Sequence, residues 1–575
     1  MPHRAHLFSL RIGHAVRESC LAEPYGRGQL GRDLLSGLAV GIIAIPLAMA
    51  LAIASGVPPQ HGLYTAIIAG FLIALTGGSR YSVSGPTAAF VVILYPIAQQ
   101  YGLAGLLLAS VMAGFLLVVL ALLRLGRFIE YIPESVTLGF TGGIAVVIAI
   151  LQVPDLLGLS LGAMPAHFID KLEAIALALP SAHWPSLLVA LATLVVLLLW
   201  PRLKTPVPPH LPALVVGTLA ALWLSQQGFS VDTIGSRFNY PLAEGGTGRG
   251  IPPFLPQFAW PWQQPGPGGG QLDLSWQLLR DLVPAAFAIA MLGAIESLLC
   301  AVVLDGMTGR RHSANSELLG QGIGNIVAPL FGGITATAAI ARSAANVRAG
   351  AQTPVAAMVH GLVVLVGLVA LAPLLASLPM AAMAALLLVV AWNMSEAPKA
   401  LRLLRTAPRG DLWVFATCFS LTVLLDMVIA ITTGVLLAAV LFVREVAEMT
   451  RVTEVTDGPN LAAGGVPEGW SVFRISGPLF FAAADRVFGE LAALIRGRRG
   501  ILLDLEGVSI IDAGGLSALT RLIDQCQRDG CRLGIAALQF QPLKTLARAG
   551  LKPIDGVLSF HPTLADALQD LAPTS

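Results

Sequence analysis

The sequence is dominated by apolar runs long enough to cross a lipid bilayer, and this feature restricts the possible folds more than any other. A transmembrane helix needs about 20 mostly apolar residues. Charged residues make up only 12% of the chain, whereas soluble domains have about 25%, which excludes a soluble single-core enzyme. The runs predict fourteen membrane-spanning segments, at residues 34–55, 61–78, 84–99, 103–123, 134–152, 185–200, 210–228, 280–304, 317–333, 337–349, 354–377, 379–396, 410–427 and 429–448.

The C-terminal end has a different composition. Residues 452–575 contain 11 Lys or Arg and 13 Asp or Glu residues. Strand-like and helix-like patterns alternate there, which predicts a small α/β domain. We therefore divide the chain into an N-terminal segment, a transmembrane domain, a linker and a C-terminal α/β domain, at residues 1–33, 34–449, 450–468 and 469–575.

Basic residues indicate how the transmembrane domain is oriented, because Lys and Arg are enriched in cytoplasmic loops. With fourteen spans, the two long loops 153–184 and 229–279 fall on one side of the membrane and contain only Lys171, Arg237 and Arg249. Most of the other basic residues of this domain fall on the opposite side. We expect both termini to be cytoplasmic.

The net charge and the absence of several sequence motifs exclude some classes of function. A net charge of +2 offers no basic face to nucleic acid. The five cysteines are odd in number and have no C-x-x-C spacing. The sequence shows no Ser-His-Asp arrangement, paired catalytic carboxylates or metal-ligand cluster. We expect no enzymatic activity, no cofactor and no metal ion.

Two apolar segments, residues 81–96 and 332–350, are interrupted in a matching way. Each begins with small or hydroxyl-bearing residues and then becomes helical, as a helix that starts within the membrane would. Paired interrupted segments are typical of a transporter binding site. Two helix N-termini facing one cavity favour an anion, and Arg342 adds a full positive charge. The alternatives are close helix packing by the small residues, and an ion pair or interfacial position for Arg342.

Glu296 lies well inside an otherwise uncharged span. An acid at this depth is costly and faces the protein interior or water, so a functional role is the first hypothesis. If Glu296 is neutral when the anion is bound, a proton and the anion enter together. The alternative is a structural hydrogen bond to a neighbouring helix.

Other polar residues are weaker candidates. We interpret Asp426 as an interfacial or inter-helix partner, and His61 and Tyr64 as interfacial anchors. Charges in and beside one short loop are either gating pairs or ordinary solvated groups, namely Asp305, Arg310, Arg311 and Glu317.

The run PQHGLYTAIIAGFLIALTGGSR at 59–80 and the stretch at 296–350 resemble the sulfate permease family of anion transporters. The C-terminal domain resembles a STAS domain, which these transporters share with anti-sigma-factor antagonists. Within the family, motifs such as SVSGPTAAFVVILYP and SGPLFFAAA are similar to those of a bacterial aerobic four-carbon dicarboxylate transporter. The resemblance implies fourteen spans in two inverted seven-span repeats, a core domain that moves against a gate domain, and a homodimer.

In this family the substrate lies between the starts of spans 3 and 10. The resemblance therefore implies a proton-coupling role for Glu296 and an anion site formed by Ser84, Gly85, Thr87, Ala339, Ile340, Ala341 and Arg342. This chain departs from many relatives at Leu47, where they have Gln, and at Ala339 and Ala341, where some have hydroxyl residues, so backbone N–H groups would bind the anion. Gly514 replaces the phosphorylatable Ser of the antagonists.

We therefore expect a secondary active transporter of a bacterial inner membrane, working by alternating access. The expected substrates are four-carbon dicarboxylates (succinate, fumarate and aspartate), coupled to protons rather than sodium. Alternatives are sulfate or bicarbonate transport, an anion-sensing receptor that signals through the STAS domain, and a nucleobase carrier. A cytoplasmic protein partner of the STAS domain is also expected.

Overall fold

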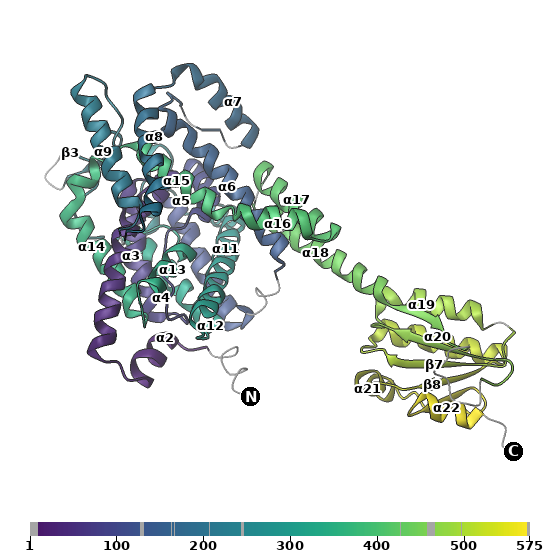
Figure 1. Cartoon of the computed structure of the whole chain (residues 1–575). Coiled ribbons are helices and arrows are strands. Elements are labelled where there is room, and N and C mark those ends of the chain that lie inside the picture. The colour runs from purple at the N-terminus through teal and green to yellow at the C-terminus, as the bar shows by residue number, and fades with distance from the viewer. Residues whose placement is uncertain are drawn as a thin grey trace. The chain divides into compact units, whose positions relative to one another are not determined.

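The computed structural model describes residues 10–126, 132–162, 164–165, 167–205, 207–242, 246–425, 427–456, 466–495 and 497–571. The chain divides into two compact units, Met1–Val435 and Leu436–Ser575. Figure 1 shows the first unit as a helical bundle and the second as a sheet with helices.

The main helices of the first unit coincide with the predicted spans. They are α3 (Arg27–Ala54), α4 (Pro59–Thr76), α5 (Ala88–Leu122), α6 (Glu134–Leu157), α8 (Trp184–Leu199), α9 (His210–Gln226), α11 (Trp276–Thr308), α12 (Ala314–Val327), α13 (Ile340–Arg348), α14 (Val355–Ala376), α15 (Met380–Met394), α17 (Arg409–Leu424) and α18 (Met427–Met449), the last of which continues into the second unit. The helix α5 comprises two predicted spans, because Gly102 has a φ of 67° and a ψ of −170° and interrupts it. The fourteen predicted spans are thus confirmed as helical segments.

Length and composition separate these helices into two kinds. Among the described residues, eight helices are long and apolar enough to cross a membrane. By contrast, α12 has 14 residues and α13 has nine, and both contain buried polar side chains. Such short polar helices are stable at membrane depth only when other protein segments surround them.

Shorter elements lie before, between and within the predicted spans. The unit also contains α2 (His14–Val16), a π-helix (Arg17–Ala22), α7 (Phe168–Ala178), α10 (Ile234–Arg237), α16 (Ala397–Thr406) and the strands β1 (Ser84–Gly85), β2 (Asn239–Pro241), β3 (Thr247–Arg249) and β4 (Thr337–Ala338). The sequence did not predict α7, which lies in a segment that we expected to be an outer loop, or α16.

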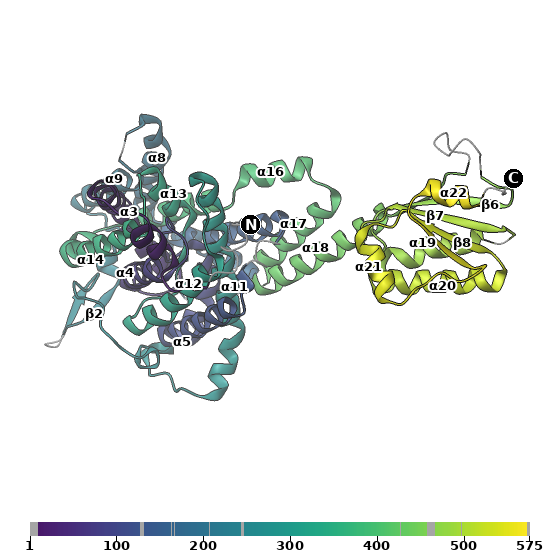
Figure 2. The ribbon, with the colours of Figure 1, turned by 90° about the horizontal axis from the view of Figure 1, so that it is seen from below.

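The helices pack in two groups. In the first group, α3 packs against α14 and α4, and α5 packs against α11 and α12. In the second group, α6 packs against α15 and α17, and α8 packs against α9 and α15. Close packing of α4 on α3 depends on Gly62, where an added Cβ would lie 2.0 Å from the carbonyl oxygen of Ala48. Figure 2 shows the bundle from below.

The second unit confirms the predicted α/β domain. Its sheet has the order β5 (Arg451–Glu454), β6 (Trp470–Ser476), β7 (Gly500–Gly507), β8 (Arg532–Ala536) and β9 (Leu558–His561), and only the β5–β6 pair is antiparallel. The connecting helices are α19 (Phe481–Leu494), α20 (Ala513–Asp529), α21 (Phe540–Arg548) and α22 (Leu564–Leu571). The larger core cluster joins the sheet to α19, α20 and α21, and a smaller one joins it to α22.

Candidate functional site

Two short strands bring the two interrupted helices together. β1 and β4 pair antiparallel, with Ser84 opposite Ala338 and Gly85 opposite Thr337. After these strands, α5 begins at residue 88 and α13 at residue 340. The two helix N-termini therefore lie beside one another, and no side chain of a described residue caps either of them. N–H groups of their first turns have no partner within the helices.

Arg342 lies in the first turn of α13 and crosses to the other interrupted segment. Its side chain is 3% exposed, and Nη2 donates a hydrogen bond to the carbonyl oxygen of Pro86 at 2.6 Å. A Cβ added to Gly85 would lie 2.7 Å from Nη1, so glycine leaves the space for the guanidinium. Nε and Nη1 have no hydrogen-bond partner among the described residues. Arg342 is therefore a buried cation with donors available to a ligand, rather than an interfacial residue.

Glu296 of α11 lies at the start of α5. Its Oε2 accepts a hydrogen bond of 2.8 Å from Oγ1 of Thr87, the residue before the first turn of that helix. The Glu296 side chain is partly exposed, and at the start of α13 Ile340 is 39% exposed and Ala341 is also exposed. The structure thus brings together all eight residues that the resemblance implied, at one junction of α5, α11 and α13.

A row of polar side chains on α12 supports this junction, and we did not single it out from the sequence. Glu317, Gln321 and Asn325 are spaced by four residues, so they lie along one side of the helix, which we call the polar face of α12. Nε2 of Gln321 donates to Oγ of Ser84 at 3.1 Å and to Oγ of Ser297 at 3.0 Å. The polar face of α12 therefore holds the side chain of Ser84 in β1.

Glu317 is the acid of this row, and it is 1% exposed. Its Oε2 accepts hydrogen bonds from the backbone N–H groups of Gly78 and Ser79, both at 3.0 Å. Its Oε1 accepts from Ser297 at 3.0 Å and Gln321 at 3.2 Å. The interpretation of Glu317 as a gating or solvated loop charge is wrong, because the turn after α4 and the helices α11 and α12 enclose it.

Asn325 holds the other strand. Its Nδ2 donates to the carbonyl oxygen of Ala336, and its Oδ1 accepts from the backbone N–H of the same residue, both at 2.8 Å. Thr337 of β4 donates to the carbonyl oxygen of Gly293 in α11 at 2.9 Å. The four-residue spacing of polar residues in an otherwise apolar span was the sequence signal that could have revealed this support.

The other predicted candidates have structural roles or lie elsewhere. His61 is 7% exposed and its Nδ1 is 2.7 Å from the carbonyl oxygen of Gly332, so the predicted interfacial anchor is a buried contact to the segment before β4. Tyr64 contacts the ring of His61 edge-on. Asp426 lies outside the described residues.

The charged residues at the end of α11 and in the loop after it form ion pairs, but not with one another. Oδ2 of Asp305 lies 2.8 Å from Nδ1 of His312. Arg310 pairs at 3.1 Å with Glu23, which belongs to the segment before α3. Arg80 is buried and donates to both carboxylate oxygens of Glu23. Hydrogen bonding from Arg80 lowers the pKa of Glu23 below its ordinary value. The N-terminal segment is thus fastened to the turn that leads into β1.

The comparisons with known proteins agree with this architecture. The model of the sulfate permease family matches residues 30–418, and that of the STAS domain matches residues 464–567. The chain belongs to the sulfate permease family. It is 40% identical over 528 residues to the putative sulfate transporter YvdB of Bacillus subtilis, covering 92% of this chain and 95% of that protein. It is 30% identical over 536 residues to the bicarbonate transporter BicA of Synechocystis, covering 90% of each.

Two solved structures have the same fold. The transmembrane domain of a cyanobacterial bicarbonate transporter BicA superposes with a TM-score of 0.61 at 29% identity, covering 71% of this chain and 98% of that one. The murine Slc26a9 anion transporter in its inward-facing state superposes with a TM-score of 0.82 at 20% identity, covering 97% and 94%. None of these names specifies a dicarboxylate, so they do not support the finer resemblance to a dicarboxylate transporter.

Proposed function

We propose that the chain carries a small oxyanion across the bacterial inner membrane together with a proton, by alternating access. The observation that carries the proposal is the β1–β4 pair, which sets two uncapped helix N-termini and the buried Arg342 at one point. Helix N-termini and a guanidinium with unpaired donors favour an oxyanion. Ser84, Gly85, Thr87 and residues 339–342 would form the binding site.

Glu296 supplies the proposed coupling. Its carboxylate is one hydrogen bond from Thr87 and so lies beside the place where an anion would bind. Two negative charges at this distance repel each other strongly where water is scarce. Protonation of Glu296 removes one of them, so binding of the anion and binding of the proton favour each other.

Two kinds of observation support candidate substrates. Relatives that are named sulfate and bicarbonate transporters make an inorganic oxyanion the first candidate. Four-carbon dicarboxylates are the second candidate, supported by the motifs around residues 81–96 and 476–484. Membership of the family also leads us to propose a homodimer, with both termini in the cytoplasm.

The test is uptake into proteoliposomes of labelled sulfate, bicarbonate and succinate, with and without an imposed proton gradient and with sodium varied. We expect one anion to accumulate in response to the proton gradient. The variant Glu296→Gln mimics the protonated acid, so it should still exchange anions across the membrane but lose acceleration by the gradient. Glu173→Gln, at an exposed position of α7, is the matched control.

Three results would contradict the proposal. If Glu296→Gln keeps the pH dependence of the wild type, Glu296 does not couple the proton. If the protein binds an anion but accumulates none under a proton gradient, an anion-sensing receptor replaces the transporter. Preference for uncharged uracil over all three anions would select a nucleobase carrier instead.

A further inference from the structure

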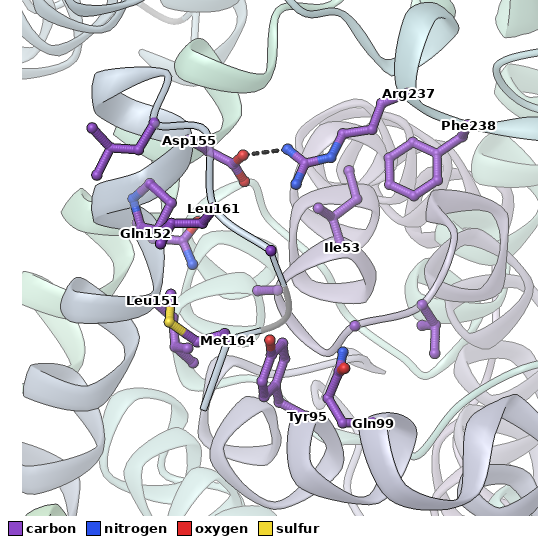
Figure 3. Close-up of a pocket in the computed structure, with 16 residues that line it drawn as sticks. Ile53, Tyr95, Gln99, Leu151, Gln152, Asp155, Leu161, Met164, Arg237 and Phe238 are labelled. Carbon is purple, nitrogen blue, oxygen red and sulfur yellow. Dashed lines mark hydrogen bonds and ion pairs between the residues drawn. The ribbon is translucent and has the colours of Figure 1, made fainter. Parts of the chain in front are cut away.

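A polar cavity lies apart from the junction of α5, α11 and α13. Its volume is about 300 Å³, and we call it the outer pocket. Figure 3 shows its walls, which come from the ends of α3 and α6, the first half of α5, residues 159, 161, 162 and 164 of one loop, and residues 237–238 at the end of α10. The last two of these stretches belong to the two segments that the charge distribution predicts to lie outside. None of the eight candidate site residues lines this pocket.

One helix connects the outer pocket to the candidate anion site. Tyr95 lines the pocket and lies eight residues after Thr87, which is about 12 Å along the axis of α5. The pocket is therefore well placed to receive a solute before it reaches the start of that helix.

Among the described residues that line the outer pocket, one is a cation and one is an acid. Arg237 of α10 forms an ion pair with Asp155 of α6 across the pocket, as Figure 3 shows. The Arg237 side chain is 48% exposed and that of Asp155 is 20% exposed. An ion pair that is partly solvated contributes little free energy, so the guanidinium can exchange one carboxylate for another anion at small cost.

Three neutral polar side chains also line the pocket. The hydroxyl of Tyr95 and the amides of Gln99 and Gln152 line the pocket and have no hydrogen-bond partner among the described residues. Gln152 is only 4% exposed. Its amide atoms are not among the fully buried atoms of the described residues that lack a partner, so the amide is open to water or to a solute in the pocket and can donate to an anion bound there.

We propose that the outer pocket is a second binding site for the same class of small oxyanion, occupied before the anion reaches the start of α5. In the occupied state an anion oxygen replaces Asp155 on Arg237, and Tyr95, Gln99 and Gln152 donate hydrogen bonds to the anion. A guanidinium suits this exchange because it presents parallel N–H donors to planar or tetrahedral oxyanions. This inference rests on the proposed function, and it adds an outer station to the transport route.

Opposite effects of two variants distinguish this site from an ion pair that only fastens two segments. If Arg237 binds the anion and Asp155 competes with it, Arg237→Gln should raise the half-saturating external anion concentration by about fivefold. Asp155→Asn should lower it by a similar factor, with little change in maximal rate. Arg249→Gln, on an exposed residue of β3 outside the pocket, should leave both parameters unchanged.

The other outcomes overturn the inference. If both variants change uptake in the same direction, the ion pair serves only to fasten the loop of Arg237 to α6. If Asp155→Asn raises the half-saturating concentration and Arg237→Gln lowers it, the pocket binds a cation. If neither variant changes it, the pocket is not on the transport route.

A binding assay separates failure of this site from failure of the proposed function. A cysteine introduced by Gln99→Cys can be labelled with an anionic methanethiosulfonate in the purified full-length protein, with Cys20→Ser removing the partly exposed native cysteine. Sulfate should slow the labelling, and Arg237→Gln should abolish this protection, whether or not transport occurs. Labelling that sulfate does not slow would overturn the outer site even if the protein transports sulfate.

Discussion

Replacing Glu317 by Gln tests whether the polar face of α12 positions the candidate anion site. The carboxylate accepts four hydrogen bonds, two from backbone N–H groups and two from side chains. Backbone donors cannot reverse their direction, so the new amide must turn its oxygen toward Gly78 and Ser79. Its NH₂ group then faces Ser297 and Nε2 of Gln321. The hydroxyl of Ser297 can rotate to accept a hydrogen bond, but Nε2 of Gln321 cannot.

The size of the effect follows from how Gln321 responds. Its Oε1 has no partner among the described residues, so the Gln321 amide can turn over and accept from the new NH₂ group. That movement withdraws the donor from Ser84. The lost hydrogen bond costs about 1 kcal/mol, and each of the two backbone donors loses about 1 kcal/mol when a neutral oxygen replaces a charged one. We expect a loss of about 3 kcal/mol in unfolding free energy for Glu317→Gln, and a larger loss for Glu317→Ala.

Uptake by Glu317→Gln should fall by more than the loss of unfolding free energy explains, because Ser84 of β1 loses its hydrogen bond from Gln321. We expect uptake by folded Glu317→Gln protein to fall about tenfold, the equivalent of about 1.4 kcal/mol. Gln321→Leu removes the same contact to Ser84 while leaving three hydrogen bonds on Glu317, so it should lower uptake with a smaller loss of stability. Thermal unfolding and uptake are measured on the same preparations, with Glu173→Gln as the control.

The reasoning is refuted if Glu317→Gln transports like the wild type, or if its defect disappears at a temperature where the variant is fully folded. Either result would make Glu317 a purely structural acid. A normal rate in Gln321→Leu would show that β1 does not need this support.

Two further predictions follow from contacts near the site. Gly85→Ala should lower uptake by about tenfold or more, because its Cβ would lie 2.7 Å from Nη1 of Arg342 and overpacking costs about 1–3 kcal/mol. Gly293→Ala is the control in the same region, because its Cβ would meet only a ring carbon of Phe90, at 3.4 Å. Equal uptake by the two variants would contradict this prediction. Because hydrogen bonding from Arg80 lowers the pKa of Glu23, the pair stabilises the fold above the ordinary carboxylate pKa and loses this contribution as the pH falls through the lowered value. Glu23→Gln should therefore lower the unfolding temperature at pH 7 but not at a pH below that value, and a difference that is independent of pH would count against the ion pair.

The spans and the interrupted helices could be predicted because their signals are local. A run of about 20 apolar residues indicates a span wherever it occurs. Small and hydroxyl-bearing residues before a helical pattern indicate a helix that starts inside the membrane, as residues 81–96 and 332–350 do. Glycine at position 85 has a similar local meaning, although only the structure shows that it makes room for Arg342.

The contacts that complete the site are not local, and the sequence did not predict them. Gln321 bonds to Ser84, which is 237 residues away, and Arg237 pairs with Asp155, 82 residues away. Glu317 follows a charged loop, so its position suggested solvent, but the turn after α4 folds over it. The sequence around a charged residue at the end of a span does not show which other segment covers that residue. Its burial depends on how distant segments pack against each other.

The hydrogen bonds around the two strands indicate which parts of the unit move together. α12 holds both strands, through Gln321 on β1 and Asn325 on β4. α11 adds a hydrogen bond that Glu296 accepts from Thr87 at the start of α5, and one that the carbonyl oxygen of Gly293 accepts from Thr337 of β4. All of these bonds join elements of the first helix group, so changing the shape of the site would break several buried hydrogen bonds at once. Moving the whole first group against the group of α6, α8, α9, α15 and α17 would break none of them. The alternating access that we propose therefore requires rigid movement of the intact site, and the partly solvated pair of Asp155 and Arg237 is a contact that can open at small cost.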